Sequence, residues 1–115
     1  MVTNITNFGR SGLSDWLVQR VSAIILALYT LFIVAYLLLN PGLDYATWSG
    51  LFAQTWVRIF SLLAFVSIAA HAWIGLWTVT TDYLKPTGIR VGIQTLIILA
   101  IFVFLVWGIQ ILWGA

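Results

Sequence analysis

The sequence predicts an all-α membrane protein with three transmembrane helices. Hydrophobic residues make up 63% of the 115-residue chain, charged residues make up only 7%, and the mean hydropathy is +1.08. Five basic and three acidic residues cannot cover the surface of a water-soluble domain, so lipid must surround most of the chain. Three apolar stretches are long enough to cross a bilayer, which takes about 20 helical residues. We expect one membrane domain over 1–115, with spans at about 16–39, 55–83 and 90–113.

The first predicted span follows a polar tail, Met1–Asp15. Either Ser14 or Asp15 is suited to the N-cap of a helix, and a carboxylate there is also stabilised by the positive end of the helix dipole. The apolar stretch ends at Asn40-Pro41-Gly42, because these turn-forming residues stop a helix. Two small hydroxyl residues interrupt the stretch, namely Ser22 and Thr30.

A short connection, Leu43–Gln54, joins the first span to the second and carries residues typical of the membrane interface (Asp44, Tyr45 and Trp48). The second span is the longest of the three. A charged, helix-breaking segment, Lys85–Gly88, separates it from the third span, which Arg90 opens. The third span has few polar members: Gln94, Thr95 and Gln110.

The basic residues predict the orientation of the chain. With three spans, Arg10, Arg20, Lys85 and Arg90 lie on one side of the membrane, and only Arg58 lies on the other. By the positive-inside rule, the N-terminus faces the cytoplasm and the C-terminus the periplasm. We therefore expect a multi-pass protein of a bacterial inner membrane. The basic residues form no run, so nucleic acid is excluded as a partner.

His71 is the only histidine, and it lies near the middle of the second span. A charged group at that depth costs on the order of a few kcal/mol, so an ionisable residue there points to a function. The competing interpretation is a neutral histidine that hydrogen-bonds between packed helices. At about 100° per residue, the positions that share its face carry small or polar side chains: Ala64, Ser67, Gly75, Thr78 and Asp82. Such a face admits either a flat ligand or a closely packed helix, and the residues leave both open.

An imidazole beside a cleared face is suited to axial ligation of haem, because histidine commonly holds haem iron. Gly75, one turn beyond His71, would leave space for the macrocycle. A zinc site needs three or four ligands, and this chain has no cysteine. A proton relay needs further titratable groups along the span. A six-coordinate haem would take its second ligand from another polypeptide, so we expect an obligate oligomer.

Asp82 and Tyr83 follow His71 by about three helical turns, at the membrane surface. A phenol can donate a hydrogen bond to a lipid-soluble carbonyl compound, and a neighbouring carboxyl group can pass protons. The alternative is structural, because tyrosine is an ordinary interfacial residue and aspartate an ordinary solvated residue before a loop. Asp82 shares a helix face with His71, which favours the functional interpretation.

The segment His71-Ala72-Trp73-Ile74-Gly75, followed by Val79 and Asp82-Tyr83, closely resembles the hydrophobic membrane anchor subunit of bacterial succinate dehydrogenase. The resemblance covers essentially the whole chain, from a short tail and Gln19-Arg20 at the first span to an end near the membrane surface. Histidine, glycine and Asp-Tyr at these spacings in a three-span chain form a specific motif.

The resemblance implies a complex of four chains, in which a flavoprotein oxidises succinate and an iron–sulfur subunit conducts the electrons. Two anchor subunits then bind haem b and ubiquinone. By this likeness, His71 is one axial haem ligand and the second anchor supplies the other. Arg20 matches the basic residue near the haem propionates, and Tyr83 with Asp82 matches part of the quinone site. On its own the chain would catalyse nothing, being a non-catalytic subunit of an oxidoreductase.

Three other interpretations stay open on the sequence alone. The first is an anchor of the fumarate reductase type, since no residue fixes a reduction potential. The second is a haem-free structural or assembly protein of the membrane, in which His71 only bridges helices. The third is a small transporter subunit, although the chain has neither an inverted repeat nor a charged path across the span.

Overall fold

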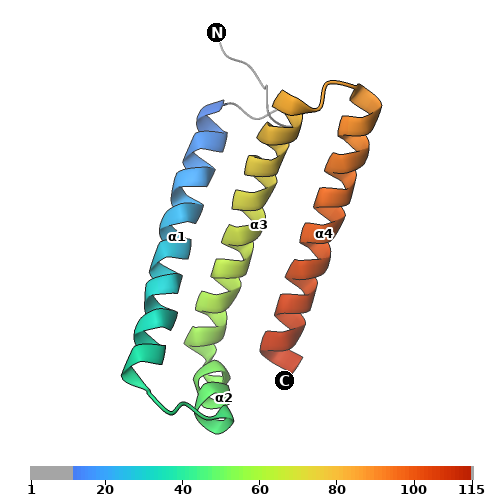
Figure 1. The fold of residues 1–115 in the computed structure, drawn as a ribbon. Helices are drawn as coiled ribbons and strands as arrows, with labels where there is room; N and C mark the ends of the chain where they lie inside the picture. The colour runs from blue at the N-terminus through green and yellow to red at the C-terminus, as the bar shows by residue number, and fades with distance from the viewer. Residues whose placement is uncertain (1–11, 115) are drawn as a thin grey trace.

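A computed structural model of the protein describes residues 12–114 and consists of four helices (Figure 1). They are α1 (Gly12–Leu39), α2 (Tyr45–Ala53), α3 (Thr55–Tyr83) and α4 (Thr87–Gly114). Helices α1, α3 and α4 contain 28, 29 and 28 residues and are long and apolar enough to cross a membrane. The predicted all-helical, three-span architecture is therefore confirmed.

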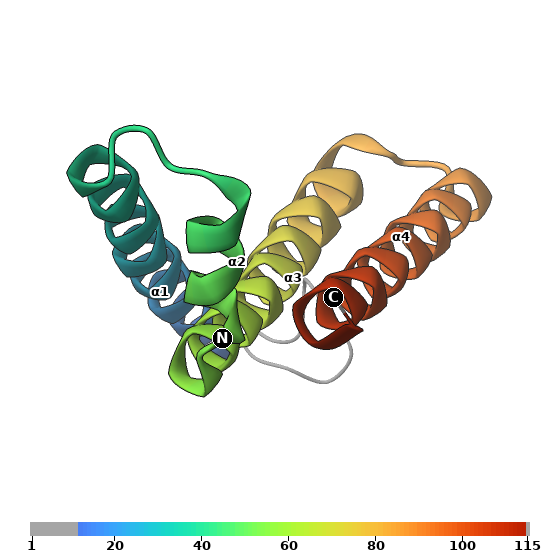
Figure 2. The ribbon, with the colours of Figure 1, turned by 90° about the horizontal axis from the view of Figure 1, so that it is seen from below.

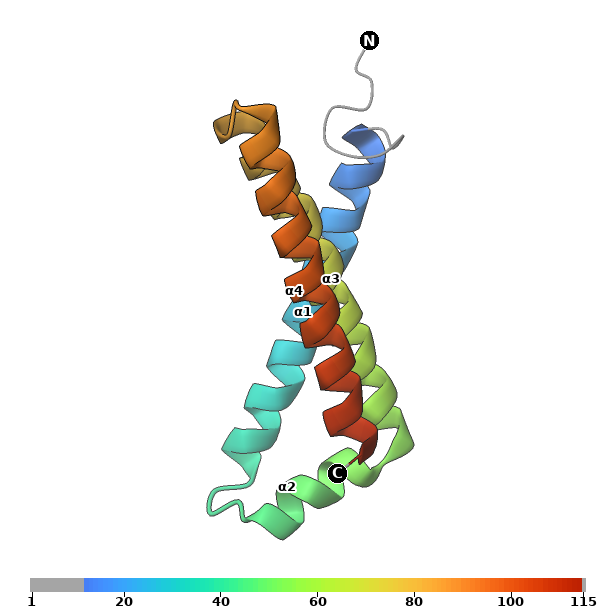
Figure 3. The same cartoon turned by 90° about the vertical axis from the view of Figure 1, so that its right-hand side faces the viewer.

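Helix α3 occupies the centre and is the helix that packs against each of the other three. Viewed from one end, α1 and α4 lie on opposite sides of α3 (Figure 2). Helix α1 is inclined to the other two long helices and crosses them (Figure 3). The start of α1 and the α3–α4 connection lie at one end, which we call the Asp82 end, and α2 lies at the other, the α2 end (Figure 1). In this arrangement His71, on α3, faces α1, where it contacts Ser22.

The beginning of α1 differs from the prediction. The chain is already helical at Gly12, so Ser14 and Asp15 lie inside the first turn, and the prediction that one of them is the N-cap was wrong. Asp15 is buried there, with only 6% of its surface exposed. The helix dipole stabilises a carboxylate in the first turn just as it stabilises a carboxylate at the N-cap. The sequence alone therefore does not distinguish the two positions.

The connection between the first two spans contains helix α2, which the sequence pattern did not predict. Asp44 caps it, because its Oδ1 accepts a hydrogen bond of 2.8 Å from the backbone N–H of Thr47. This bond lowers the pKa of the Asp44 carboxyl group, since it stabilises the charged form. Gln54 alone separates α2 from α3. The third long helix also begins earlier than expected, at Thr87 instead of near Arg90.

Polar side chains join the long helices within their apolar surfaces. Tyr29 on α1 shares a hydrogen bond of 2.6 Å with Ser61 on α3, and Gln94 on α4 donates one of 2.8 Å to Thr80. Thr80 and Gln94 are both 6% exposed. Because lipid chains are as apolar as the side chains they would replace, hydrogen bonds and close packing hold membrane helices together. These pairs therefore fix how α1 and α4 sit against α3.

Gly108 on α4 makes room for the Phe65 ring of α3. A Cβ atom at this position would lie 2.8 Å from two ring carbons of Phe65, which is too close for a carbon–carbon contact. We expect Gly108→Ala to displace the Phe65 ring and to lower the free energy of unfolding by about 1–3 kcal/mol, as overpacking does. Thermal or detergent denaturation of the purified protein measures this loss.

Gly92 provides the matched control on the same helix, because a Cβ atom there would have no neighbour within 4 Å. We expect Gly92→Ala to be neutral or slightly stabilising, since alanine favours a helix more than glycine does. Equal stability of the two variants would show that the contact between Gly108 and Phe65 does not limit the packing of α4.

Candidate functional site

His71 lines a hollow of about 510 Å³ between α1 and α3, in the half of the molecule toward the Asp82 end. Helix α1 contributes residues from its first turns, and α3 contributes residues from the turns around and after His71. The lining includes Trp16, Gln19, Arg20, His71, Gly75 and Thr78. Two of the residues predicted for a haem site, His71 and Arg20, are therefore in one cavity although 51 positions separate them in the chain, from 20 to 71.

The orientation of the His71 ring is set by Ser22, which is 4% exposed. Ser22 Oγ lies 3.0 Å from His71 Nδ1 and 3.2 Å from the backbone carbonyl oxygen of Gln19. The single serine hydrogen can go to the carbonyl or to Nδ1; when it goes to the carbonyl, Nδ1 carries the imidazole hydrogen and donates it to Oγ. Nε2 then keeps its lone pair. A hydrogen bond of this kind to the second ring nitrogen is typical of a histidine that ligates a metal.

The hollow also contains a polar atom that lacks a partner. Gln19 Oε1 is buried and, within residues 12–114, accepts no hydrogen bond. Leaving such a group unsatisfied costs about 1–3 kcal/mol, so a bound water or ligand is expected to supply the missing partner. The amide nitrogen of the same side chain would lie 3.5 Å from a Cβ atom at Gly75, which is an ordinary contact. Gly75 thus widens the hollow where Gln19 faces it.

Arg20 lies at the rim of the hollow and is exposed. Its guanidinium carbon lies 5.2 Å from the centre of the Trp16 ring, one turn earlier on α1, in a cation–π arrangement. This contact orients the side chain, and within residues 12–114 the guanidinium N–H groups donate no hydrogen bond. A positive charge in this position favours a ligand that carries carboxylates.

The face of α3 around His71 has two different halves. Toward the α2 end, Ala64 and Ser67 are buried, 1% and 4% exposed, as in a tight helix seam. Toward the Asp82 end, Gly75 and Thr78 line the hollow. One half of this small-residue face is therefore a packed helix seam, and the other half leaves space in which a ligand could fit. His71 lies where the seam opens, because α1 crosses α3 at an angle (Figure 3).

Asp82 and Tyr83 lie in the last turn of α3 and do not line this hollow. Both are exposed, and Tyr83 is 78% exposed. The structure thus brings Arg20 to His71 but leaves the Asp-Tyr pair on the outer surface of the Asp82 end. Any walls that enclose a ligand around Tyr83 must come from outside residues 12–114.

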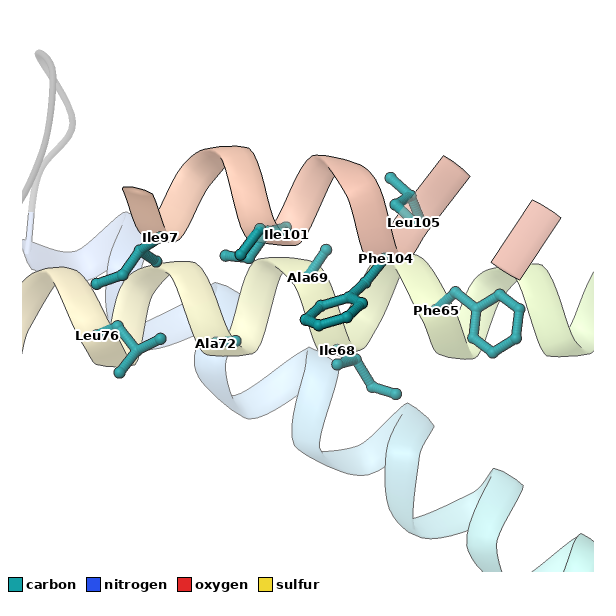
Figure 4. A pocket seen from close by; sticks show the side chains of 10 residues that line it. Phe65, Ile68, Ala69, Ala72, Leu76, Ile97, Ile101, Phe104 and Leu105 are labelled. Carbon is teal, nitrogen blue, oxygen red and sulfur yellow. The ribbon is translucent and has the colours of Figure 1, made fainter. Parts of the chain in front are cut away.

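The described part of the chain contains no cluster of metal-binding side chains. No three histidine, cysteine, aspartate or glutamate side chains gather within residues 12–114, so His71 could act only as a single ligand from this chain. A groove of about 390 Å³ between α3 and α4 is lined only by apolar side chains, including Ile68, Ala72 and Ile101 (Figure 4). This groove provides no group for ligation or hydrogen bonding.

Sequence reasoning missed Ser22 and Gln19 as site residues. Ser22 was noted only as a polar interruption of an apolar span, and Gln19 only as the neighbour of Arg20. A serine in such a span is a signal that a polar partner exists. The partner itself lies 49 positions away, so only the packing of α1 on α3 identifies it.

Comparison with known proteins gives concordant results. The family model for the succinate dehydrogenase/fumarate reductase transmembrane subunit matches residues 3–109. The chain is 41% identical over 106 residues to the succinate dehydrogenase hydrophobic membrane anchor subunit of Coxiella burnetii, covering 92% of each chain. It is 30% identical over 105 residues to the subunit of the same name from Rickettsia bellii, covering 88% of this chain and 84% of the relative.

Proposed function

This chain belongs to the family of succinate dehydrogenase and fumarate reductase transmembrane subunits, and on that basis we propose that it provides one ligand to haem b and part of a ubiquinone-reduction site. It is similar to proteins named as membrane anchors, which accords with a non-catalytic subunit. Its proposed partners are a second anchor subunit, an iron–sulfur subunit and a flavoprotein. The resemblance inferred from His71, Gly75 and Asp82-Tyr83 is confirmed at the level of the family.

The observation that carries the haem proposal is the hydrogen bond between His71 Nδ1 and Ser22 Oγ beside a hollow of about 510 Å³. Haem b, when bound, would supply one-electron transfer. His71 would hold it through Nε2, which the bond between Nδ1 and Ser22 leaves free. Arg20 would bind the propionates with its exposed guanidinium group. The proposed second anchor would supply the other histidine.

Tyr83 and Asp82 act on the quinone. The Tyr83 hydroxyl donates a hydrogen bond to a quinone carbonyl oxygen, which favours the build-up of negative charge there. Asp82, the adjacent carboxylate, passes protons from the aqueous surface to that oxygen. The quinone takes up two electrons, derived from succinate, and two protons, and leaves as quinol. The iron–sulfur subunit and the second anchor supply the other walls of the site.

The orientation proposed for the chain places the Asp82 end in the cytoplasm of a bacterium and the α2 end in the periplasm. Three basic residues lie toward the Asp82 end, namely Arg20, Lys85 and Arg90. Arg58 lies in the first turn of α3, at the α2 end. This distribution satisfies the positive-inside rule. Arg10, which the prediction also used, lies outside the described residues.

An anchor of the fumarate reductase type is the second candidate, because the family model covers both enzymes. The names of the two relatives favour succinate oxidation. Succinate:ubiquinone and quinol:fumarate activities, measured on the same preparation, distinguish the two directions.

The proposal is tested on the complex purified from membranes through a tag on this chain. We expect a flavoprotein and an iron–sulfur protein to co-purify and the reduced-minus-oxidised optical spectrum to show a b-type haem. A complex with both partners but no haem would refute the haem assignment and favour a haem-free anchor. Purification without a flavoprotein would refute the anchor role and favour an assembly protein.

A further inference from the structure

A second hollow with polar groups, of about 390 Å³, lies at the α2 end and shares no lining residue with the hollow around His71. All four helices contribute to it. Its polar lining includes Tyr45, Ser49 and Arg58, and its apolar lining includes Phe65, Ile111 and Leu112. The hollow is therefore amphipathic, and its elements come together at the α2 end of the molecule, opposite the Asp82 end (Figures 1 and 3).

Arg58 carries the positive charge of this hollow. It is partly buried in the first turn of α3, and its Nε donates a hydrogen bond of 2.7 Å to the backbone carbonyl of Phe52 on α2. That bond fixes the side chain across the α2–α3 junction. A guanidinium group has five N–H donors, so the terminal Nη groups retain donors for a ligand.

No carboxylate within residues 12–114 neutralises Arg58, and the bond to Phe52 is the one polar contact that its side chain makes there. The acidic residue nearest in the chain is Asp44, and its Oδ1 caps α2 through Thr47. Asp15 and Asp82 belong to the opposite end of the molecule. A partly buried cation beside hydrocarbon needs a counter-charge, because burying an unpaired charge is costly.

We propose that this hollow binds a phospholipid, with the phosphodiester on Arg58 and an acyl chain along the apolar wall of Phe65, Ile111 and Leu112. The planar fork of arginine matches phosphate oxygens, and the Ser49 hydroxyl can donate a further hydrogen bond. Tyr45 and Trp48 are residue types that gather at headgroup depth. A neutral ligand would leave the charge of Arg58 uncompensated, and a free anion would leave the apolar wall unfilled. The phosphate could belong to a lipid or to a free anion. The lining combines a cation with an apolar wall, and this combination favours the lipid.

The test uses the complex purified through this chain, stripped of lipid in detergent and titrated with phosphatidylglycerol, with bound lipid counted by native mass spectrometry. We expect wild-type protein to hold one more lipid per copy of this chain than the Arg58→Gln variant does. The substitution removes a charge-assisted hydrogen bond, so the affinity of the site for the lipid should fall about tenfold or more. Arg90→Gln removes one positive charge at the opposite end and should bind as wild type does. Arg58→Gln also leaves the positive-inside balance intact.

Two ligands and a second variant separate the sources of binding. Diacylglycerol has the tails without the phosphate, and inorganic phosphate has the anion without the tails, so neither should occupy the site as phosphatidylglycerol does. Ala53→Phe places bulk in the hollow without changing its charge and should also lower lipid binding. The proposal would be overturned if wild type and Arg58→Gln bound equal amounts of phosphatidylglycerol, or if inorganic phosphate alone occupied the site as well as the lipid does. A carboxylate of a partner subunit found on Arg58 would also overturn it. Haem content, read on the same samples, reports separately on the proposed function.

Discussion

Replacing His71 with alanine is expected to remove haem b from the complex. His71 is the one histidine of the chain. Its Nδ1 is hydrogen-bonded to Ser22, so Nε2 remains available as a ligand. Alanine offers no lone pair to the iron. The reduced-minus-oxidised spectrum of the purified complex should lose its b-type signal or change to that of a haem with one altered ligand.

Two further variants separate ligation from helix packing. Tyr29→Phe removes another hydrogen bond between α1 and α3, the one to Ser61, without touching the hollow of His71, and should keep its haem. Ser22→Ala leaves the ligand in place but frees Nδ1, so we expect haem affinity to fall about 10–100-fold, as for other outer partners of ligating histidines. If His71→Ala retained a wild-type spectrum, or if Tyr29→Phe lost as much haem, His71 would be only a bridge between helices.

Replacing Tyr83 with phenylalanine is expected to lower succinate:quinone reductase activity by about 10²-fold, the low end of what one hydrogen-bond donor to a developing negative charge contributes. The fold should not suffer, because Tyr83 is 78% exposed and makes no polar or ring contact within the described residues. The loss should appear in the rate with quinone. Succinate oxidation with a water-soluble artificial acceptor should stay unchanged, since it bypasses this site.

Tyr45→Phe is the matched control for Tyr83→Phe. Tyr45 is 80% exposed and lies at the α2 end, so it is an interfacial tyrosine of nearly the same exposure on the other side of the membrane. Its substitution should leave quinone reduction intact. Equal losses in the two variants, or no loss in either, would show that Tyr83 serves only to position the helix at the interface.

The long helices could be predicted from the sequence because their cause is local. About 20 apolar residues in a row must form a helix in lipid, where every backbone polar group needs an internal partner. Helix α2 was missed, since nine residues between two turn-forming segments give no such signal. The cap of α1 was misplaced for a related reason, because Ser14 and Asp15 favour the first turn as well as the N-cap.

Hydropathy, length and residue type were enough to predict the lipid environment and the three spans, and they singled out His71, Asp82 and Tyr83 as candidate site residues. The family motif from His71 to Tyr83 is likewise contained in the sequence. The packing of the helices was needed to show that Ser22 engages His71, that Arg20 shares its hollow and that Tyr83 stays outside. Those outcomes depend on where α1 crosses α3. In lipid, where hydrophobicity favours no particular helix contact, that crossing is set by small residues and by hydrogen bonds between positions far apart in the chain.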